Sequence, residues 1–196
     1  MLKKIIPAYF ILIFMLFYTM NICTAANPAS QKPVKIVILP IINPSAEYPD
    51  VNVYIDKQLH RAVHIPLNGV LEKTALIDTN AINTALQALN INADDLDNKN
   101  SLQSLAQSLN SDLIISIKIL RMHQYINYAP VNIVEPVIHS SVCLQLSVYD
   151  SRTNLYKSYN KAAFFDDSYS PQGTVQSLTR DILYNLLRKA QIKQYL

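Results

Sequence analysis

Hydrophobic residues form nearly continuous aliphatic runs at two places in the chain. The run at residues 34–39 is stopped by Pro40, and the run at residues 113–120 is interrupted only by a serine and a lysine. Continuous aliphatic runs are typical of strands that are covered on both faces. A shorter apolar segment at residues 71–77 predicts a further strand. The runs at residues 34–39 and 113–120 are expected to lie inside a sheet.

Two further segments alternate apolar and polar residues. Residues 142–148 and 155–164 have this pattern, and the turn residues 150–154 lie between them. Alternation is typical of strands with one covered face, and a short polar turn between two such strands predicts an antiparallel hairpin. Residues 41–50, with two prolines, and residues 123–136 are predicted to be loops.

Four segments repeat apolar residues at the spacing of a helix. The first covers residues 51–64 and ends before Pro66, because the residue before a proline is disfavoured in the α region. The second follows Asp78 or Thr79, either of which offers a side-chain cap. The expected buried positions are Val53, Leu59 and Val63 in the first helix, and Ile82, Ala85, Leu86 and Leu89 in the second.

The third predicted helix is capped by Asn100 or Ser101, and Asn110 is a candidate left-handed stop. The closing helix follows Ser170 as the cap, with Pro171 at the first helical position. The expected buried positions are Leu102, Leu105, Ala106 and Leu109 in the third helix, and Val175, Leu178, Ile182, Leu186 and Ala190 in the closing helix.

The order of elements is therefore β-α-β-α-α-β-β-β-α. A sheet with a parallel part and an antiparallel part follows from this order, in a single three-layer-like α/β domain at residues 34–196.

The first 26 residues have the pattern of a secretory signal. Lys3 and Lys4 precede an apolar run at residues 5–22, and small residues end with Ala26, after which cleavage is expected. Residues 27–33 then form a tether. The alternatives are a retained membrane anchor and acylation at Cys23, against which the bulky Ile22 argues. The protein is thus expected to be exported, to the periplasm or another extracytoplasmic location.

The charge balance excludes the class of nucleic-acid-binding proteins. The chain has 17 Lys and Arg against 14 Asp and Glu, and removal of Lys3 and Lys4 with the leader leaves 15 against 14. Phosphate binding needs a concentrated basic face. Cys143 is the only cysteine after residue 26, so no internal disulfide is expected and an inert thiol is predicted.

Patterns for catalysis, cofactors and metals are missing. His60 and His64 stand at i and i+4, but the residue after His60 is Arg61 in place of the glutamate of a zinc protease. The chain has two glycines, too few for a phosphate-binding loop or a dinucleotide fingerprint. We therefore expect no cofactor, no metal site and no enzymatic activity.

Two predicted loops carry the candidate binding residues. Ligands of open α/β sheets gather beyond the carboxyl ends of the parallel strands, here the segments after the first and third strands. These segments are rich in tyrosine and proline and poor in charge, which favours a protein-binding surface over a reaction centre. The candidate residues are Asn43, Glu47, Tyr48, Tyr125 and Tyr128.

Three segments resemble a superfamily of cell-envelope domains. They are the strand that ends in Leu39-Pro40 before Asn43, residues 74–78, and the pattern A-x-x-L-x-x-D-hydrophobic from Ala106 to Leu113. The superfamily includes the amino-terminal domain of the Tol-Pal translocation protein, the curli-secretion lipoprotein and lipoprotein activators of penicillin-binding proteins. The chain departs from it in having Asn110-Ser111 at a usual glycine position and in lacking the acylated cysteine.

The resemblance implies a non-enzymatic protein that docks on another cell-envelope protein, and ring assembly in some members leaves oligomerisation open. The leading interpretation is therefore an exported protein-interaction or assembly module. One alternative is an envelope hydrolase or metal enzyme with a site assembled from distant residues such as Asp50, His60 and His64. Another is a small-ligand carrier, which a large apolar pocket would favour.

Overall fold

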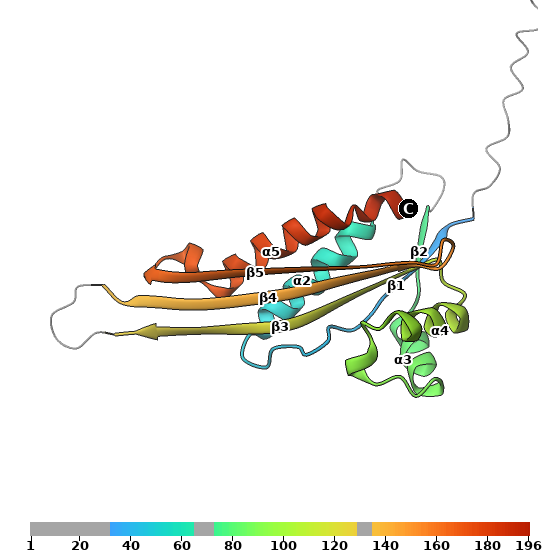
Figure 1. Ribbon diagram of the computed structural model, residues 1–196, viewed down its shortest axis with the longest axis horizontal. Helices are drawn as coiled ribbons and strands as arrows, with labels where there is room; N and C mark the ends of the chain where they lie inside the picture. The colour runs from blue at the N-terminus through green and yellow to red at the C-terminus, as the bar shows by residue number, and fades with distance from the viewer. Residues whose placement is uncertain (1–31, 65–72, 129–134) are drawn as a thin grey trace, which may run out of the picture. The chain divides into compact units, whose positions relative to one another are not determined.

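Five strands form one mixed sheet in the order β2-β1-β3-β4-β5 in this computed structural model, which describes residues 32–64, 73–128 and 135–196 (Figure 1). β1 runs parallel to β2 and β3, whereas β3, β4 and β5 are antiparallel. The predicted fold class and order of elements are confirmed. The elements are β1 (Val34–Ile38), α2 (Pro49–Val63), β2 (Thr74–Leu76), α3 (Thr79–Ala88), η2 (Ala93–Asp95), α4 (Lys99–Leu109), β3 (Leu113–Asn127), β4 (Val137–Asp150), β5 (Leu155–Ser168), η3 (Pro171–Gly173), α5 (Val175–Ala190) and η4 (Ile192–Tyr195).

Some predictions fall outside the described residues. The proposed leader at residues 1–26, residues 27–31 of the proposed tether, Pro66 and the beginning of the predicted strand at residues 71–77 all lie there. The described part of that strand, Thr74–Leu76, is a strand as predicted, and it pairs with β1 at the edge of the sheet.

Helices cover both faces of the sheet around β1 and the first part of β3. α2 and α5 lie on one face, and α3 and α4 lie on the other (Figure 1). Neighbouring residues of β1 therefore enter different cores: Ile36 packs in the cluster with Ile55 and Ile182, and Val37 packs in the cluster with Leu102. Burial on both sides explains why the run at residues 34–39 is continuously aliphatic.

The third, fourth and fifth strands extend far beyond β1. The parallel pairing of β1 with β3 ends at Ile38 opposite Ile115, and Ile42 makes one further bridge to Lys118. From there β3, β4 and β5 continue as a three-stranded sheet. We refer to residues 121–127, 137–143 and 162–168 as the distal strands.

The predicted loop at residues 123–136 is wrong over much of its length. β3 continues to Asn127, β4 begins at Val137, and residues 129–134 lie outside the described residues. A β-bulge between Ile119 and Arg121 shifts the register and changes the phase of the alternation. The aliphatic run ends at this bulge, so the sequence loses its strand signal although the backbone pairing continues.

The two ends of α2 and its buried side also differ from the prediction. The helix begins at Pro49, two residues earlier than expected, and its buried residues are Val51, Ile55, Leu59 and Val63. Val53 is 67% exposed and is not part of the core. The i+4 steps from Val51 to Val63 define the stripe, and Val53 lies between them.

Helix caps follow the expected chemistry at only some of the predicted positions. The Asp78 carboxylate accepts from the backbone N–H of Asn80, and Asn110 adopts the left-handed conformation with φ 48° and ψ 49°, as predicted. α4 is capped by Asn98, upstream of the two predicted candidates. Thr174 caps α5 through Ser177, because Pro171 begins a separate short turn, η3.

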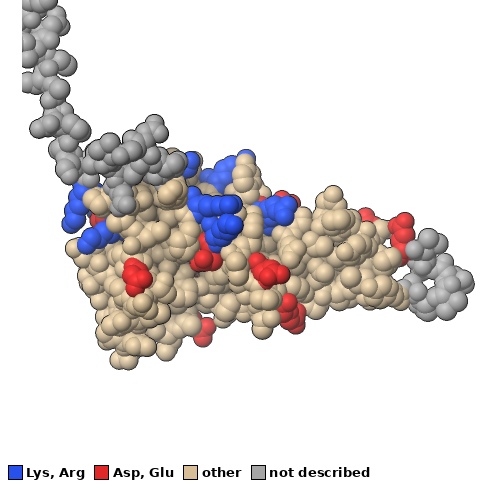
Figure 2. All heavy atoms as spheres, turned by 180° about the vertical axis from the view of Figure 1, so that it is seen from behind, with Lys and Arg blue, Asp and Glu red and all other residues tan. Residues whose placement is uncertain are grey.

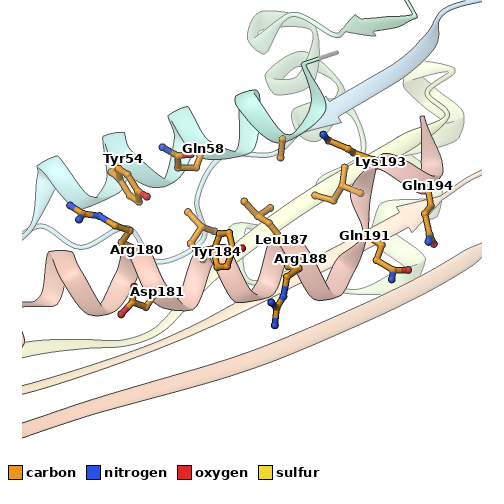
Figure 3. A pocket seen from close by; sticks show the side chains of 13 residues that line it. Tyr54, Gln58, Arg180, Asp181, Tyr184, Leu187, Arg188, Gln191, Lys193 and Gln194 are labelled. Carbon is orange, nitrogen blue, oxygen red and sulfur yellow. The ribbon is translucent and has the colours of Figure 1, made fainter. Parts of the chain in front are cut away.

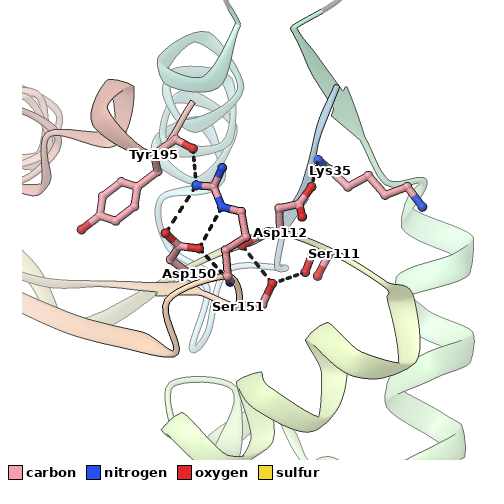
Figure 4. A network of polar contacts seen from close by, with 7 residues as sticks. Lys35, Ser111, Asp112, Asp150, Ser151 and Tyr195 are labelled. Carbon is pink, nitrogen blue, oxygen red and sulfur yellow. Dashed lines mark hydrogen bonds and ion pairs between the residues drawn. The ribbon is translucent and has the colours of Figure 1, made fainter. Parts of the chain in front are cut away.

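A polar network fixes the β4–β5 turn to two other parts of the domain (Figure 4). The Arg152 guanidinium donates to the buried Asp150 carboxylate at 3.1 and 3.3 Å and to the Tyr195 carbonyl oxygen at 2.6 Å. The Ser151 hydroxyl donates to the carbonyl oxygen of Ser111 at 2.6 Å. Tyr195 lies in η4 after α5, and Ser111 lies just before β3. The β4–β5 turn is therefore bonded to η4 and to the beginning of β3.

Asp112, the aspartate of the motif A-x-x-L-x-x-D, has a structural role. Its carboxylate accepts from the backbone N–H of Lys35 at 2.8 Å, and its own N–H donates to the Lys35 carbonyl oxygen at 2.9 Å. These two bonds set β1 beside β3 at the beginning of their pairing.

Candidate interaction surface

The predicted loop residues do not form one site. Tyr48 lies on the helix-covered side of the sheet, where it packs against the core cluster. Tyr125 lies on the opposite side of β3 and is 46% exposed. Tyr128 follows the end of β3 and is 78% exposed. Asn43 and Glu47 are exposed on the segment between β1 and α2.

Tyr48 links this segment to the distal part of β3. Its hydroxyl donates to the Gln124 carbonyl oxygen at 3.5 Å, and the Gln124 side chain accepts from the N–H of Val175 at 2.8 Å. Burial raises the pKa of the Tyr48 phenol, and the negative charge of Glu47 raises it further. Tyr48 thus holds this segment against β3, and the Gln124 side chain holds the beginning of α5 there.

The strand pairing places side chains of the distal strands in rows on the side away from α2 and α5. Residues of the opposite parity on β4 are buried, and Val142 among them packs in the cluster with α2 and α5. We call the uncovered side the outer distal face. Its rows are Arg121, Cys143 and Ala162; His123, Ser141 and Phe164; Tyr125, His139 and Asp166; and Asn127, Val137 and Ser168.

An aromatic and polar chain of contacts crosses the outer distal face. The Tyr125 ring stacks on the His139 ring, with centroids 4.5 Å apart and planes at 18°, and His123 lies 5.4 Å from Tyr125. His139 Nδ1 lies 2.8 Å from Asp166 Oδ1, and its Nε2 lies 3.2 Å from Asn127 Nδ2. One neutral tautomer of His139 makes both contacts, donating from Nδ1 and accepting at Nε2.

Phe164 gives this face its largest exposed apolar side chain. It is 66% exposed, and the Arg121 guanidinium lies 6.0 Å from the centre of its ring. In the view of Figure 2, Lys and Arg atoms gather away from the end of the distal strands, where a few Asp and Glu atoms lie on an otherwise uncharged visible surface. Exposed aromatic residues with arginine and few other charges are typical of protein-binding surfaces.

The geometry of the other candidates does not assemble a reaction centre from the described residues. His60 Nδ1 lies 3.0 Å from the Asp56 carbonyl oxygen and 3.5 Å from its carboxylate, so its contacts stay within α2. Cys143 is a half-buried free thiol on β4. Among residues 32–64, 73–128 and 135–196, no group of three His, Cys, Asp or Glu side chains is placed to hold a metal ion.

Sequence reasoning missed His139, Phe164 and Asp166 as surface residues. Their cross-strand neighbours are set by the register of β3, β4 and β5. The predicted loop at residues 123–136 left the distal part of β3 out of this pairing. The only available signal was the alternation of residues 155–164, which places Phe164 on one face without identifying what covers it. No helix in the described part of the chain has the length and apolar character to cross a membrane.

No protein-family model matches the chain, and no match is found among curated proteins. Among solved structures, the chain is similar to lipoprotein GNA1162 from Neisseria meningitidis, with 15% identity, 80% of this chain and 99% of that chain covered, and a TM-score of 0.45. Hypothetical protein CT253 from Chlamydia trachomatis has 18% identity, coverage of 84% and 98%, and a TM-score of 0.43. The C-terminal domain of LpoB from Salmonella enterica has 14% identity, coverage of 69% and 86%, and a TM-score of 0.38. Each of these three is a distant structural similarity.

Proposed function

We propose that the chain is an exported, non-enzymatic interaction module that binds another cell-envelope protein through the outer distal face. The observation that supports this proposal is the asymmetry of the distal strands. Val142 on their helix side is fully buried in the core cluster formed with α2 and α5, whereas Tyr125 and Phe164 on the other side are 46% and 66% exposed. Burial of exposed aromatic area is a main source of binding free energy in protein complexes.

The predicted loop residues have different roles in this proposal. Tyr125 lies at the centre of the outer distal face, and Tyr128 extends it beyond the end of β3. Asn43 and Glu47 lie on the segment that accompanies β3 from the Ile42 bridge at Lys118 to the Tyr48 contact at Gln124. We assign Asn43 and Glu47 to the polar rim of the surface, and Tyr48 to positioning that rim.

Site-specific photo-crosslinking tests the surface. A benzophenone amino acid is placed at Phe164 in one strain and, as the matched control, at Val53, which is equally exposed on α2. We expect one specific covalent adduct from position 164 and none of the same mass from position 53. The partner is identified from the adduct by mass spectrometry and then purified.

The purified pair provides the decisive measurement. Truncation of an aromatic residue at the centre of an interface typically weakens binding by ten- to thirtyfold, about 1.4–2 kcal/mol. We therefore expect Tyr125→Ser and Phe164→Ser each to raise Kd at least tenfold, and Val53→Ser to leave it unchanged. Equal effects at all three positions would exclude the outer distal face as the binding surface.

Export is tested separately by determining the amino terminus of the protein recovered from cells. We expect a soluble envelope protein that begins at Asn27. A chain that begins at Met1 would show a retained leader, and a lipid on Cys23 would show acylation. Either result would contradict the proposed processing while leaving the binding experiment interpretable.

A further inference from the structure

The sheet has two edges of very different length. β2, at one edge, has three residues, whereas β5, at the other edge, has 14. β5 pairs with β4 in one continuous register from Leu155 to Ser168, without a bulge and without a proline. In the part of the chain that the structure describes, no strand lies beyond β5. A long, regular edge of this kind presents unpaired backbone groups and favours the addition of another strand.

The hydrogen bonds of the sheet identify the residues of β5 whose backbone faces the open edge. The Tyr169 N–H donates to the Pro136 carbonyl oxygen at 2.8 Å. Backbone groups of successive strand residues point to alternate sides, so the odd-numbered residues of β5 bond to β4. The even-numbered residues therefore direct their N–H and carbonyl groups away from β4. They are Tyr156, Ser158, Asn160, Ala162, Phe164, Asp166 and Ser168.

Charges of both signs lie along β5, at its opposite ends. Lys157 and Lys161 are in the first half, Asp166 and Asp167 are in the second half, and all four are exposed. Asp166 contacts His139, whereas the other three form no ion pair with a described residue. Lysines on an edge strand normally discourage pairing. Because this strand also carries aspartates at its other end, a second copy in the reversed direction brings opposite charges together.

We propose that two copies of this chain pair antiparallel through their β5 edges, about a twofold axis at Ala162. Ala162 is the midpoint of the outward-facing residues from Tyr156 to Ser168, so this register gives every one of them a backbone partner. About 14 hydrogen bonds between the two copies then close both edges. An interface that uses the same surface of both copies is complete with two, so the assembly is a dimer.

The same register pairs side chains favourably on the helix side of the sheet. Lys157 stands opposite Asp167 of the second copy, and Tyr159 stands opposite Phe165 of the second copy. Each pair occurs twice because of the twofold axis. These odd-numbered pairs exchange no hydrogen bonds, and their Cα atoms are therefore only about 4.5 Å apart. The register that satisfies the backbone thus also joins the two free charges and two aromatic rings.

An axis at Phe164 is a less complete alternative. It would place Lys161 opposite Asp167 of the second copy, but it would leave the outward-facing groups of Tyr156 and Ser158 without a partner strand. Unpaired backbone groups at an interface oppose binding. The proposal therefore makes Lys157, and not Lys161, the partner of Asp167.

The dimer goes beyond the proposed function and leaves other surfaces of the domain open. The twofold axis is perpendicular to the sheet, so the two outer distal faces lie on the same side of the dimer and meet along β5. A groove of about 760 Å³ between α2 and α5, lined by Tyr54 and Tyr184, borders α5 on its α2 side (Figure 3). This groove is not part of the interface.

Sedimentation equilibrium of the exported chain purified from cells tests the pairing. We expect a monomer–dimer equilibrium for the unchanged protein. Lys157→Glu places a carboxylate opposite Asp167 of the second copy at two symmetric positions, and it is expected to raise the dimer Kd at least tenfold. Lys157→Glu combined with Asp167→Lys restores the pair with exchanged charges, and it is expected to return Kd to within about threefold of the unchanged protein.

Lys161→Glu is the matched control for the charge reversal. It makes the same change in charge on the same side of β5. Lys161 stands opposite Ala163 of the second copy and diagonally across the axis from the other Lys161. The substitution exchanges one like-charge pair for another, so Kd is expected to stay within about threefold. The circular dichroism spectra of all variants should match, which separates loss of the dimer from loss of the fold.

Disulfide trapping tests the position of the axis. Ala162 meets itself across the axis with Cα atoms about 5.5 Å apart, which suits a disulfide. Cys143 is its direct neighbour on β4, so Cys143→Ala is the parent protein. We expect Ala162→Cys to form a covalent dimer under mild oxidation, with the bond assigned by mass spectrometry of the linked peptides. Ser158→Cys, also outward-facing, is the control, because its two copies lie about 26 Å apart.

Several results would overturn the proposal. They are a chain that remains monomeric at its highest soluble concentration, an unchanged Kd in Lys157→Glu, and equal yields of covalent dimer from positions 158 and 162. Loss of the dimer in Lys161→Glu that Asp167→Lys restores would place the axis at Phe164 and also overturn it. An assembly larger than a dimer would do the same, because this interface closes with two copies.

Failure of this proposal is distinguishable from failure of the proposed function. The dimer is measured on the purified chain without a partner. An adduct between two copies has twice the mass of the chain, whereas an adduct with a partner contains a second protein. Tyr125 lies on β3, two strands away from the β5 edge, so Tyr125→Ser reports on partner binding without changing the dimer interface.

Discussion

β3 contains two regions with the same backbone pairing and different environments. In its first half, Ile114 and Ile115 point to opposite faces and are both fully buried, because α3 and α4 cover one face and α2 and α5 cover the other. In its second half, Met122 and Ile126 are half buried on the helix side and Tyr125 is exposed on the other. The bulge between Ile119 and Arg121 separates the two regions.

Under the proposed function, this one strand contributes to both stability and binding. A face that is covered within the domain contributes its apolar area to folding, whereas an uncovered face keeps that area available for a partner. β4 follows the same division, with Tyr149 buried under the α3–α4 layer and His139 in the open row of Tyr125. The proximal half is therefore expected to govern folding, and the distal half recognition.

The largest expected difference compares two positions on the same face of β3. Ile114→Ala leaves a cavity under α4 and is expected to lower the free energy of unfolding by about 2–5 kcal/mol. Tyr125→Ala removes an exposed ring and is expected to lower it by less than about 1 kcal/mol. Urea unfolding curves provide both values. An equal decrease in the free energy of unfolding for Tyr125→Ala and Ile114→Ala would mean that the outer distal face is covered within the domain.

The helix side of the distal strands contains a tight contact between β5 and η3. A methyl group added at Gly173 in η3 would overlap the Phe165 ring. Gly173→Ala is therefore expected to cost about 1–3 kcal/mol in unfolding free energy. Phe165→Leu frees space at this contact, so the double variant should be destabilised by less than the sum of the two single changes. If the changes in unfolding free energy of the two single variants add up to that of the double variant, the two residues are not in contact.

The polar network at the proximal end should matter more than the cationic contact at the distal end. Arg152→Ala leaves the buried Asp150 carboxylate without its guanidinium partner, and about 1–2 kcal/mol of unfolding free energy is expected to be lost. Arg121→Ala removes an exposed contact with Phe164 and should cost less than about 0.5 kcal/mol. Thermal unfolding of the two variants ranks them directly. The reverse ranking would contradict the division between the two halves.

The smallest expected effect is the contribution of Tyr48 to the loss of stability at alkaline pH. Tyr48 contacts β3 where its proximal and distal halves meet. The pKa of Tyr48 is raised above 10.0 in the folded protein by burial and by Glu47, so folding favours the neutral phenol. This contribution is complete below about pH 10 and is lost as the pH rises through the raised pKa. Tyr48→Phe should therefore reduce the fall in urea midpoint between about pH 9 and about pH 11.

Tyr128→Phe is the matched control for that experiment, because this tyrosine is mostly exposed. The control is expected to show the same alkaline fall as the unchanged protein. An identical fall in Tyr48→Phe and Tyr128→Phe would show that the Tyr48 phenol ionises as it does in the unfolded chain.

The sequence predicted the fold more fully than it predicted the candidate surface. Continuous aliphatic runs identified β1 and the beginning of β3, because burial on both faces leaves no polar positions. Local chemistry identified the Asp78 cap and the left-handed Asn110. The distal part of β3 was interpreted as a loop, because polar and aromatic residues on an uncovered face resemble loop composition. Of the predicted site residues, only Tyr125 lies within the outer distal face itself.

The sequence by itself determined the class of the domain, the order of its elements and most of the residues that enter its two cores, although Val53 and Leu89, both predicted to be buried, are exposed. Those properties depend on periodic burial, which the positions of apolar residues along the chain indicate directly. Only the tertiary structure decided that Tyr125 stacks on His139, that Phe164 lies beside Arg121, and that Arg180 lies on a groove with Tyr54. Each of these contacts joins different strands or helices, and their register and packing angle are set by the whole domain.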